Sequence, residues 1–269
     1  MLFRTVPGPG GIASNFDLPR LFRFGENYRV KIILIGRCKF EAWLDDTNDA
    51  AQYIERGNMA TTRQDWITTA RQKAIDAIRE GRTADALKGV DEIWAEGRPI
   101  HDFYGDMCAT FCDFIAEELD EGAVERAWRF IGERLWKPVF MEVAKDGAVA
   151  VAGLYAMFLR SHGYQFRIEE DDEKIVFLLD YCPSGQRLMM EGKIKGDRRH
   201  PLDHGVSSKP YPWTFGRTGV PYYCAHTELW FTTMPAEWGI PIMSTEFGQF
   251  DSEGHVIGTP CTTTFWKNR

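Results

Sequence analysis

The sequence predicts an α+β protein, with an N-terminal helical bundle followed by a small mixed α/β or mostly β domain with a Cys/His cluster. Apolar residues recur at every third or fourth position over residues 61–163, whereas they alternate with polar residues after Gly163. The chain has 269 residues, which is enough for two domains. We therefore expect an N-terminal arm and strand over 1–60, a helical domain over 61–163 and a Cys/His-containing α+β domain over 164–269.

The composition of the chain argues against nucleic-acid and membrane partners. The chain is 44% hydrophobic and 26% charged, as in globular proteins, and its formal charge of −7 argues against a nucleic-acid partner. The longest apolar stretch, Ala148–Leu159, is about half the ~20 residues that a bilayer span needs, so no membrane partner is expected. The sequence shows no apolar targeting segment near its start, and we expect a cytoplasmic protein.

The predicted elements follow in order. Residues 1–28 are rich in Gly-Pro turns and predict an arm, and Arg29–Arg37 predicts a strand. The expected helices run from Arg63 to Gly81, Ala84 to Ala95, Pro99 to about Leu119, Glu121 to Val143 with a break at Pro138, and Ala148 to His162. Residues 164–169 and 174–180 alternate around an acidic turn, which predicts a hairpin.

The helix beginning at Pro99 carries a candidate catalytic pair. At about 100° per residue, His101, Tyr104, Cys108 and Cys112 form one stripe. His101 could act as acid or base, and Tyr104 could donate to a developing anion. Equally, thiols bury as small hydrophobes, and His and Tyr are common at core margins.

The same helix has two further faces, one apolar and one acidic. The apolar face, expected to pack inward, consists of Phe103, Met107, Phe111 and Phe114. Asp102 and Asp106 fall on a third side, and such a pair usually faces solvent. His101 is therefore expected to border a cleft rather than fill the core.

Cysteines next to turn residues mark a candidate metal site in the C-terminal half. Cys182, Cys224, His226 and Cys261 could hold a divalent transition metal, zinc or iron, since thiolates and imidazoles suit both. The sequence has no Cys-x-x-Cys pair, so core thiols and a cysteine nucleophile remain alternatives.

An aromatic segment lies between these cysteines and predicts a substrate pocket. The candidate substrate-binding residues are Trp213, Phe215, Arg217 and Tyr223. Arg217 offers a planar cation to a carboxylate, and the rings offer flat apolar surface. The alternative is that the aromatic residues fill a thin core while the arginine lies along the surface.

Three segments carry a family resemblance: HDFYGDM, EEDDEKIVF leading into CPSGQRL, and PWTFGRTGVPYYCAH followed by EWGIP and PC. Over about residues 65–266 the chain resembles bacterial two-part proteins similar to the L-2-amino-thiazoline-4-carboxylic acid hydrolase-like proteins, and more distantly the 4-vinyl reductase domain. In that group a cysteine tends to follow the Cys-Ala-His step, and a glycine the first cysteine. Thr227 and Pro183 stand there in this chain, which puts a four-thiolate structural site in doubt.

The resemblance implies a small-molecule catabolic protein that opens a C–N or C–S bond. Combined with the candidate residues, it favours a metal-dependent hydrolase or lyase acting on an aromatic or carboxylate-bearing substrate, in which His101 shuttles a proton. The alternative is a non-catalytic small-ligand binding or sensor protein with a structural metal site. A homo-oligomer remains open.

Overall fold

The computed structural model describes residues 33–35, 38–40 and 67–268, and contacts divide the chain after Thr68. In the N-terminal unit, strands β1 (Ile33–Ile35) and β2 (Cys38–Phe40) pair antiparallel. β1 lies inside the strand predicted over Arg29–Arg37. The predicted arm over residues 1–28 lies outside the described residues.

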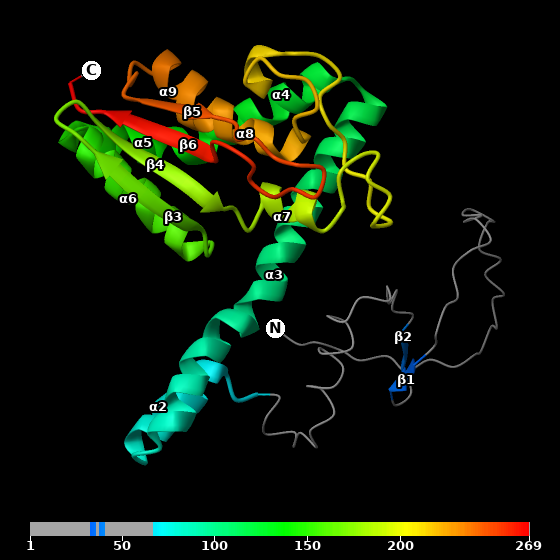
Figure 1. The fold of residues 1–269 in the computed structure, drawn as a ribbon, viewed down its shortest axis with the longest axis vertical. Helices are drawn as coiled ribbons and strands as arrows, with labels where there is room; N and C mark the ends of the chain where they lie inside the picture. Colours follow the sequence, from blue (N-terminus) through cyan, green and yellow to red (C-terminus); the bar gives the residue numbers. More distant parts are fainter. Residues whose placement is uncertain (1–32, 36–37, 41–66, 269) are drawn as a thin grey trace, which may run out of the picture. The chain divides into compact units, whose positions relative to one another are not determined.

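The second unit contains the helices and a four-stranded sheet (Figure 1). The α-helices are α2 (Ala70–Arg79), α3 (Thr83–Glu118), α4 (Glu121–Ile131), α5 (Lys137–Val143), α6 (Ala148–Ser161), α7 (Gly185–Met190), α8 (Ala225–Glu228) and α9 (Met234–Glu237). The strands are β3 (Gln165–Glu170), β4 (Lys174–Tyr181), β5 (Met243–Glu246) and β6 (Cys261–Trp266). Two π-helical turns, Gly132–Trp136 and Leu229–Thr233, follow α4 and α8.

The sheet has the order β3-β4-β6-β5, and every neighbouring pair is antiparallel. The predicted hairpin is confirmed, because β3 and β4 pair around the acidic turn. Along β4 the buried residues are Ile175, Phe177 and Leu179, so alternation turns one face toward the helices. Helices with a small antiparallel sheet make this an α+β fold, as predicted.

Helix α6 joins the helices to the sheet in one core. Tyr155 on α6 is buried, and its ring packs against Phe177 and Phe265 of the sheet. Its hydroxyl shares a hydrogen bond of 2.8 Å with Thr263 of β6. The predicted boundary near residue 163 is therefore the point where helices give way to strands around a shared core.

The two helices predicted between Ala84 and Leu119 are one helix, which corrects the prediction. Pro99 lies inside α3 and removes one backbone hydrogen bond to Ala95. Arg98 spans the proline by binding Asp102 at 2.8 and 2.7 Å. Because Ala95 is exposed, its carbonyl can accept from water instead.

The faces of α3 also differ from the prediction. Phe103, Phe111 and Phe114 are 59%, 57% and 61% exposed, whereas Asp102 and Asp106 face the rest of the unit. Ion pairs with buried cations outweigh the apolar packing expected from sequence. Among the described residues, no helix combines the length and apolar character needed to cross a membrane.

Candidate functional site

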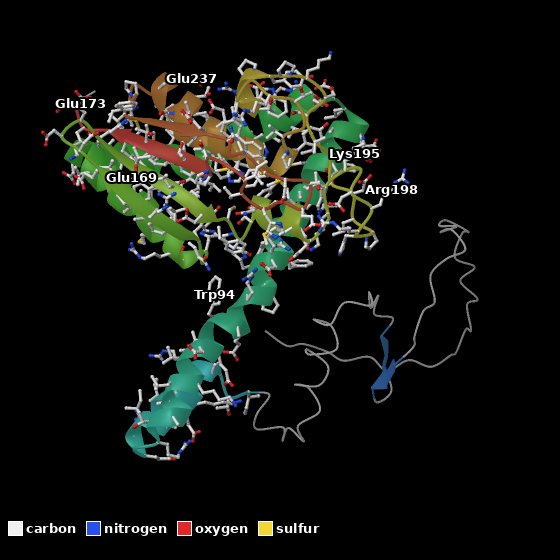
Figure 2. All side chains as sticks on the ribbon, viewed as in Figure 1. Trp94, Glu169, Glu173, Lys195, Arg198 and Glu237 are labelled. Carbon is white, nitrogen blue, oxygen red and sulfur yellow. The ribbon has the colours of Figure 1, made fainter. Side chains whose placement is uncertain are left out.

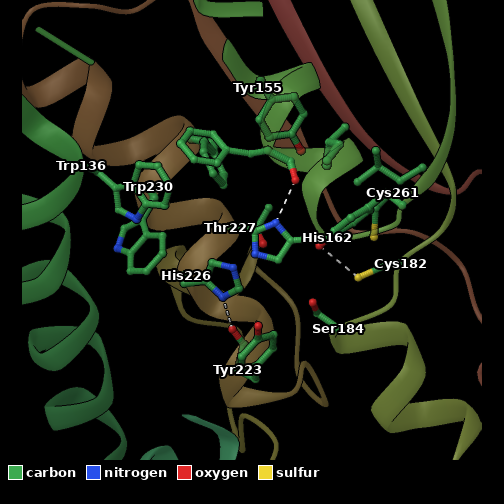
Figure 3. A pocket seen from close by; sticks show the side chains of 15 residues that line it. Trp136, Tyr155, His162, Cys182, Ser184, Tyr223, His226, Thr227, Trp230 and Cys261 are labelled. Atoms are coloured by element: carbon green, nitrogen blue, oxygen red, sulfur yellow. Dashed lines mark hydrogen bonds between the residues drawn. The ribbon is translucent and has the colours of Figure 1, made fainter. Parts of the chain in front are cut away.

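A cavity of about 180 Å³ opens between α6, the end of β4, α8 and the π-helical turns (Figure 3). We call it the aromatic cavity. Its lining residues are Trp136, Tyr155, Phe158, Leu159, His162, Tyr164, Leu179, Cys182, Ser184, Tyr223, His226, Thr227, Trp230, Phe231 and Cys261. These residues include aromatic rings, imidazoles, thiols and hydroxyls, but no Asp, Glu, Lys or Arg.

Both π-helical turns supply walls of this cavity. Trp136 ends the first turn, and Trp230 lies in the second, with ring centroids 5.4 Å apart. The turns approach closely at Gly132, where an added Cβ would lie 2.9 Å from Trp230 and 2.8 Å from Met234. Since π-helical turns are frequent at functional sites, this geometry singles out the cavity.

The two cavity imidazoles have defined tautomers. Nδ1 of His162 lies 2.8 Å from the carbonyl oxygen of Phe158, and Nδ1 of His226 bonds the carbonyl oxygen of Tyr223. Figure 3 draws both bonds as dashed lines. Because a carbonyl only accepts, Nδ1 is the donor in each ring, and in the neutral ring of His226 Nε2 keeps its lone pair.

Burial holds three of the cavity side chains, His226, Cys261 and Tyr164, in their uncharged form. Desolvation lowers the pKa of His226 from 6.5 to about 4, so its ring is neutral at physiological pH. Desolvation likewise raises the pKa of Cys261 to about 12 and that of Tyr164 well above its ordinary value. The thiol of Cys182 donates a hydrogen bond of 3.3 Å to the Tyr164 hydroxyl. His226, Cys261 and Tyr164 therefore offer neutral donors and acceptors to the cavity.

The structure brings most of the predicted metal ligands together. Cys182, His226 and Cys261 all line the aromatic cavity. Cys224 is packed behind it, since its sulfur would lie 2.3 Å from a Cβ added at Gly185. Within the described part of the chain, no three His, Cys, Asp or Glu side chains are grouped closely enough to hold a metal ion. A metal site here stays a prediction.

Neither residue of the predicted catalytic pair is among the lining residues of the aromatic cavity. The His101 ring lies 5.4 Å from that of His162, which lines the cavity, and the Nδ1 of His101 is 3.0 Å from Asp102. Tyr104 is 55% exposed and is not among the cavity residues. Trp94 projects from α3 toward the turn after α6 (Figure 2), and its ring lies 6.2 Å from His101.

The predicted substrate residues are divided between different places. Tyr223 lines the aromatic cavity, while Trp213 is 3% exposed and stacks on Tyr211. Phe215 and Arg217 line a second hollow of about 310 Å³, which we call the charged hollow. Its other residues are Pro212, Glu228, Thr232, Thr245, Glu246 and Phe247. These four side chains therefore do not form one pocket.

An ionic cluster lies where α3 meets α7, and no local pattern in the sequence predicts it. The Arg187 cluster consists of Arg187, Lys193, Asp102, Asp106 and Glu191. Arg187 is 3% exposed and binds Asp106 at 2.8 Å and Glu191 at 2.6 Å. Lys193 binds Asp106 at 2.8 Å. The cluster attaches α3 to the segment that carries Cys182.

Other cavity residues were also missed by sequence reasoning. His162, Trp136 and Trp230 all line the cavity, but no sequence motif marks them as site residues. His162 ends α6, and Trp136 precedes Pro138, but neither position has a spacing that marks a site. Only the packing of distant segments shows that they share a cavity.

Comparisons with protein-family models, curated proteins and solved structures found no match to this chain. The resemblance to the thiazoline-carboxylate hydrolase-like proteins therefore stays a prediction that rests on the quoted motifs.

Proposed function

We propose that the protein binds a small, uncharged ring compound in the aromatic cavity. Its volume of about 180 Å³ suits one ring, since an apolar cavity of about 150 Å³ can hold benzene. Aromatic walls such as Trp136, Tyr155 and Trp230 offer surface for edge and face contacts with that ring.

The observation that carries this proposal is the neutral imidazole of His226 in a cavity whose lining contains no Asp, Glu, Lys or Arg. A charged ligand would lose its hydration without gaining a counter-charge, which costs several kcal/mol. A neutral ligand bearing one hydroxyl or N–H could donate to Nε2 of His226. Cys182 and Ser184 could supply further polar contacts.

Titration calorimetry with matched probes tests this function. Phenol should bind at pH 7, whereas benzoate and benzylamine, which have similar rings but carry charge, should bind at least roughly tenfold more weakly. Equal affinity for the three probes would contradict the proposal, as would the absence of phenol binding.

A cavity-filling variant assigns the binding to the aromatic cavity. Thr227 lines it, so Thr227→Tyr should abolish phenol binding. The matched control is Thr218→Tyr at an exposed loop position, which should bind as the wild type does. Melting curves identify any loss caused by unfolding, and unchanged binding by a folded Thr227→Tyr would place the ligand elsewhere.

The predicted metal-dependent hydrolase or lyase is a second candidate. It is supported by the imidazole tautomers, because metal-binding histidines commonly donate their other N–H to a backbone carbonyl. Cys182, Cys261, His162 and His226 are the side chains that would hold zinc or iron after local rearrangement. The ion would supply Lewis-acid activation for hydrolysis. His101, next to His162, would carry the proton.

Elemental analysis separates the two candidates. The metalloenzyme predicts about one transition metal per chain in protein purified without chelator. Cys182→Ser should remove the metal, while Cys108→Ser, on α3 and outside the cavity lining, should retain it. Metal-free wild-type protein, or equal metal content in both variants, would reject this candidate and leave the binding function.

A further inference from the structure

The C-terminal half of α3 exposes a row of large apolar side chains. Ile100, Phe103, Tyr104, Phe111 and Phe114 are 57%, 59%, 55%, 57% and 61% exposed. We call these residues the α3 seam. Soluble proteins rarely leave such a contiguous row open unless it is an interaction surface.

The spacing of the seam is that of a helix-packing stripe. Ile93, Ile100, Met107 and Phe114 recur every seven residues, which places them on one side of α3. In the N-terminal half, α2 already covers this side, where Ala86 is buried.

The contact with α2 shows that this side of α3 accepts a helix at short range. A Cβ added at Gly89 would lie only 2.8 Å from Cβ of Ala74 on α2. The backbone N–H of Ala70, the first residue of α2, donates to Glu96 at 3.0 Å. Helix α2 therefore begins beside residue 96, and within the described part of the chain no other helix continues this cover over the seam from Ile100.

We propose that the α3 seam is the interface of a homodimer, in which two copies of α3 pack antiparallel about a two-fold axis near Met107. Such an axis places Ile100 of one copy opposite Phe114 of the other. Phe103 and Tyr104 then meet Phe111 of the second copy. The paired segments are roughly 21 Å long at 1.5 Å per residue.

Charge favours the antiparallel arrangement. Helix α2 carries Arg71, Lys73 and Arg79 against a single acid, Asp76. The end of α3 carries Glu117 and Glu118, both exposed. Because α2 begins beside residue 96, antiparallel pairing brings the start of α2 next to the acidic α3 end of the second copy. A parallel pair would place the two acidic ends together.

The exposed area is sufficient for a specific dimer. Large aromatic side chains bury on the order of 150–250 Å² each when fully covered. With more than half of each seam residue exposed, the seam offers on the order of 500 Å² per copy. Two copies thus reach roughly the 1,000 Å² expected of a specific interface.

Sedimentation analysis of the full chain over about a hundredfold range of concentration tests the dimer. Wild type should dimerise, and the double variant Phe103→Ser/Phe111→Ser should raise the dimer Kd by about a hundredfold. The matched control is Phe130→Ser on α4, which is equally exposed at 57% and lies off the seam. It should leave the Kd unchanged.

A charge-swap series tests the orientation. Glu117→Lys/Glu118→Lys should weaken the dimer, and adding Arg71→Glu/Lys73→Glu should restore much of the lost affinity. A wild-type monomer at every concentration would overturn the proposal, as would a dimer insensitive to the seam variant. A dimer that responds to the seam but shows no rescue would overturn the antiparallel orientation.

Discussion

The Arg187 cluster and the aromatic cavity both bury ionisable groups, but with opposite results. Desolvation alone would raise the pKa of Asp106, yet hydrogen bonds from Lys193 and Arg187 lower it below its ordinary value. In the cavity, where no lining residue offers a counter-charge, desolvation lowers the pKa of His226 to about 4. The comparison shows that a close partner of opposite charge, rather than burial alone, decides whether a buried group is ionised.

The largest expected effect comes from removing the central cation of the Arg187 cluster. Arg187→Met keeps most of the side-chain volume but leaves Asp106 and Glu191 with less compensation, so the free energy of unfolding should fall by about 3–5 kcal/mol. Urea denaturation measures this loss. The control Arg167→Met removes two exposed ion pairs, with Glu169 and Asp180, and should cost about 1 kcal/mol or less. Similar losses in both variants would show that the buried ion pairs of Arg187 contribute no more to stability than exposed ones.

The second prediction concerns stability between pH 6.5 and 4. The His226 pKa is 6.5 in the unfolded chain and about 4 in the fold, so the unfolded chain binds its proton first as the pH falls. This lowers the free energy of unfolding by on the order of 3 kcal/mol across the window, with no further loss from His226 below it. The contribution of Asp106, whose folded pKa is lowered, is lost only below about pH 4.

Denaturation at several pH values checks the second prediction. His226→Gln should flatten the slope between pH 6.5 and 4, because glutamine does not titrate. Glu228, whose pKa burial raises, titrates in both proteins, so their difference isolates His226. An unchanged slope in His226→Gln would show that this ring takes up its proton in the folded protein.

The smallest effect is expected in the charged hollow. This hollow has charged side chains, as the Arg187 cluster does, and aromatic rings, as the aromatic cavity does. Arg217 donates a hydrogen bond of 3.3 Å to the Gly248 carbonyl, and Glu228 lies in the same hollow. We expect the hollow to take a zwitterion such as phenylalanine, with its carboxylate on Arg217. Arg217→Lys should weaken phenylalanine binding about tenfold, since a bidentate charged pair contributes about 1.5–3 kcal/mol. Calorimetry should show no change in phenol binding. Equal losses of affinity for phenol and phenylalanine would show that Arg217 supports the fold and does not bind the carboxylate.

Local patterns in the sequence predicted much of the secondary structure. The alternation along residues 164–169 and 174–180 and the acidic residues between them predicted the β3–β4 hairpin, which the structure confirms. The break predicted at Pro138 appears as a π-helical turn that ends at Trp136. Each of these features depends on neighbours close in the chain, and composition and spacing contain that information.

Only the tertiary structure decided which face of α3 is buried. By hydrophobicity the Phe103 and Phe111 face should pack inward, but Asp102 and Asp106 do so because Arg187 is buried opposite them. Arg187 is far from α3 in sequence, so no local pattern connects it with these acids.

In the aromatic cavity, too, the sequence predicted some of the residues and only the tertiary structure decided the others. The sequence by itself predicted Cys182, Cys224, His226 and Cys261 as candidate metal ligands, with core thiols and a cysteine nucleophile as alternatives, and three of these four side chains line the cavity. It could not add His162 from α6 or separate Arg217 from Tyr223, since those outcomes depend on how helices and strands pack across long sequence distances. The types of chemical group were therefore determined locally, whereas their charge states and neighbours were decided by the packed fold.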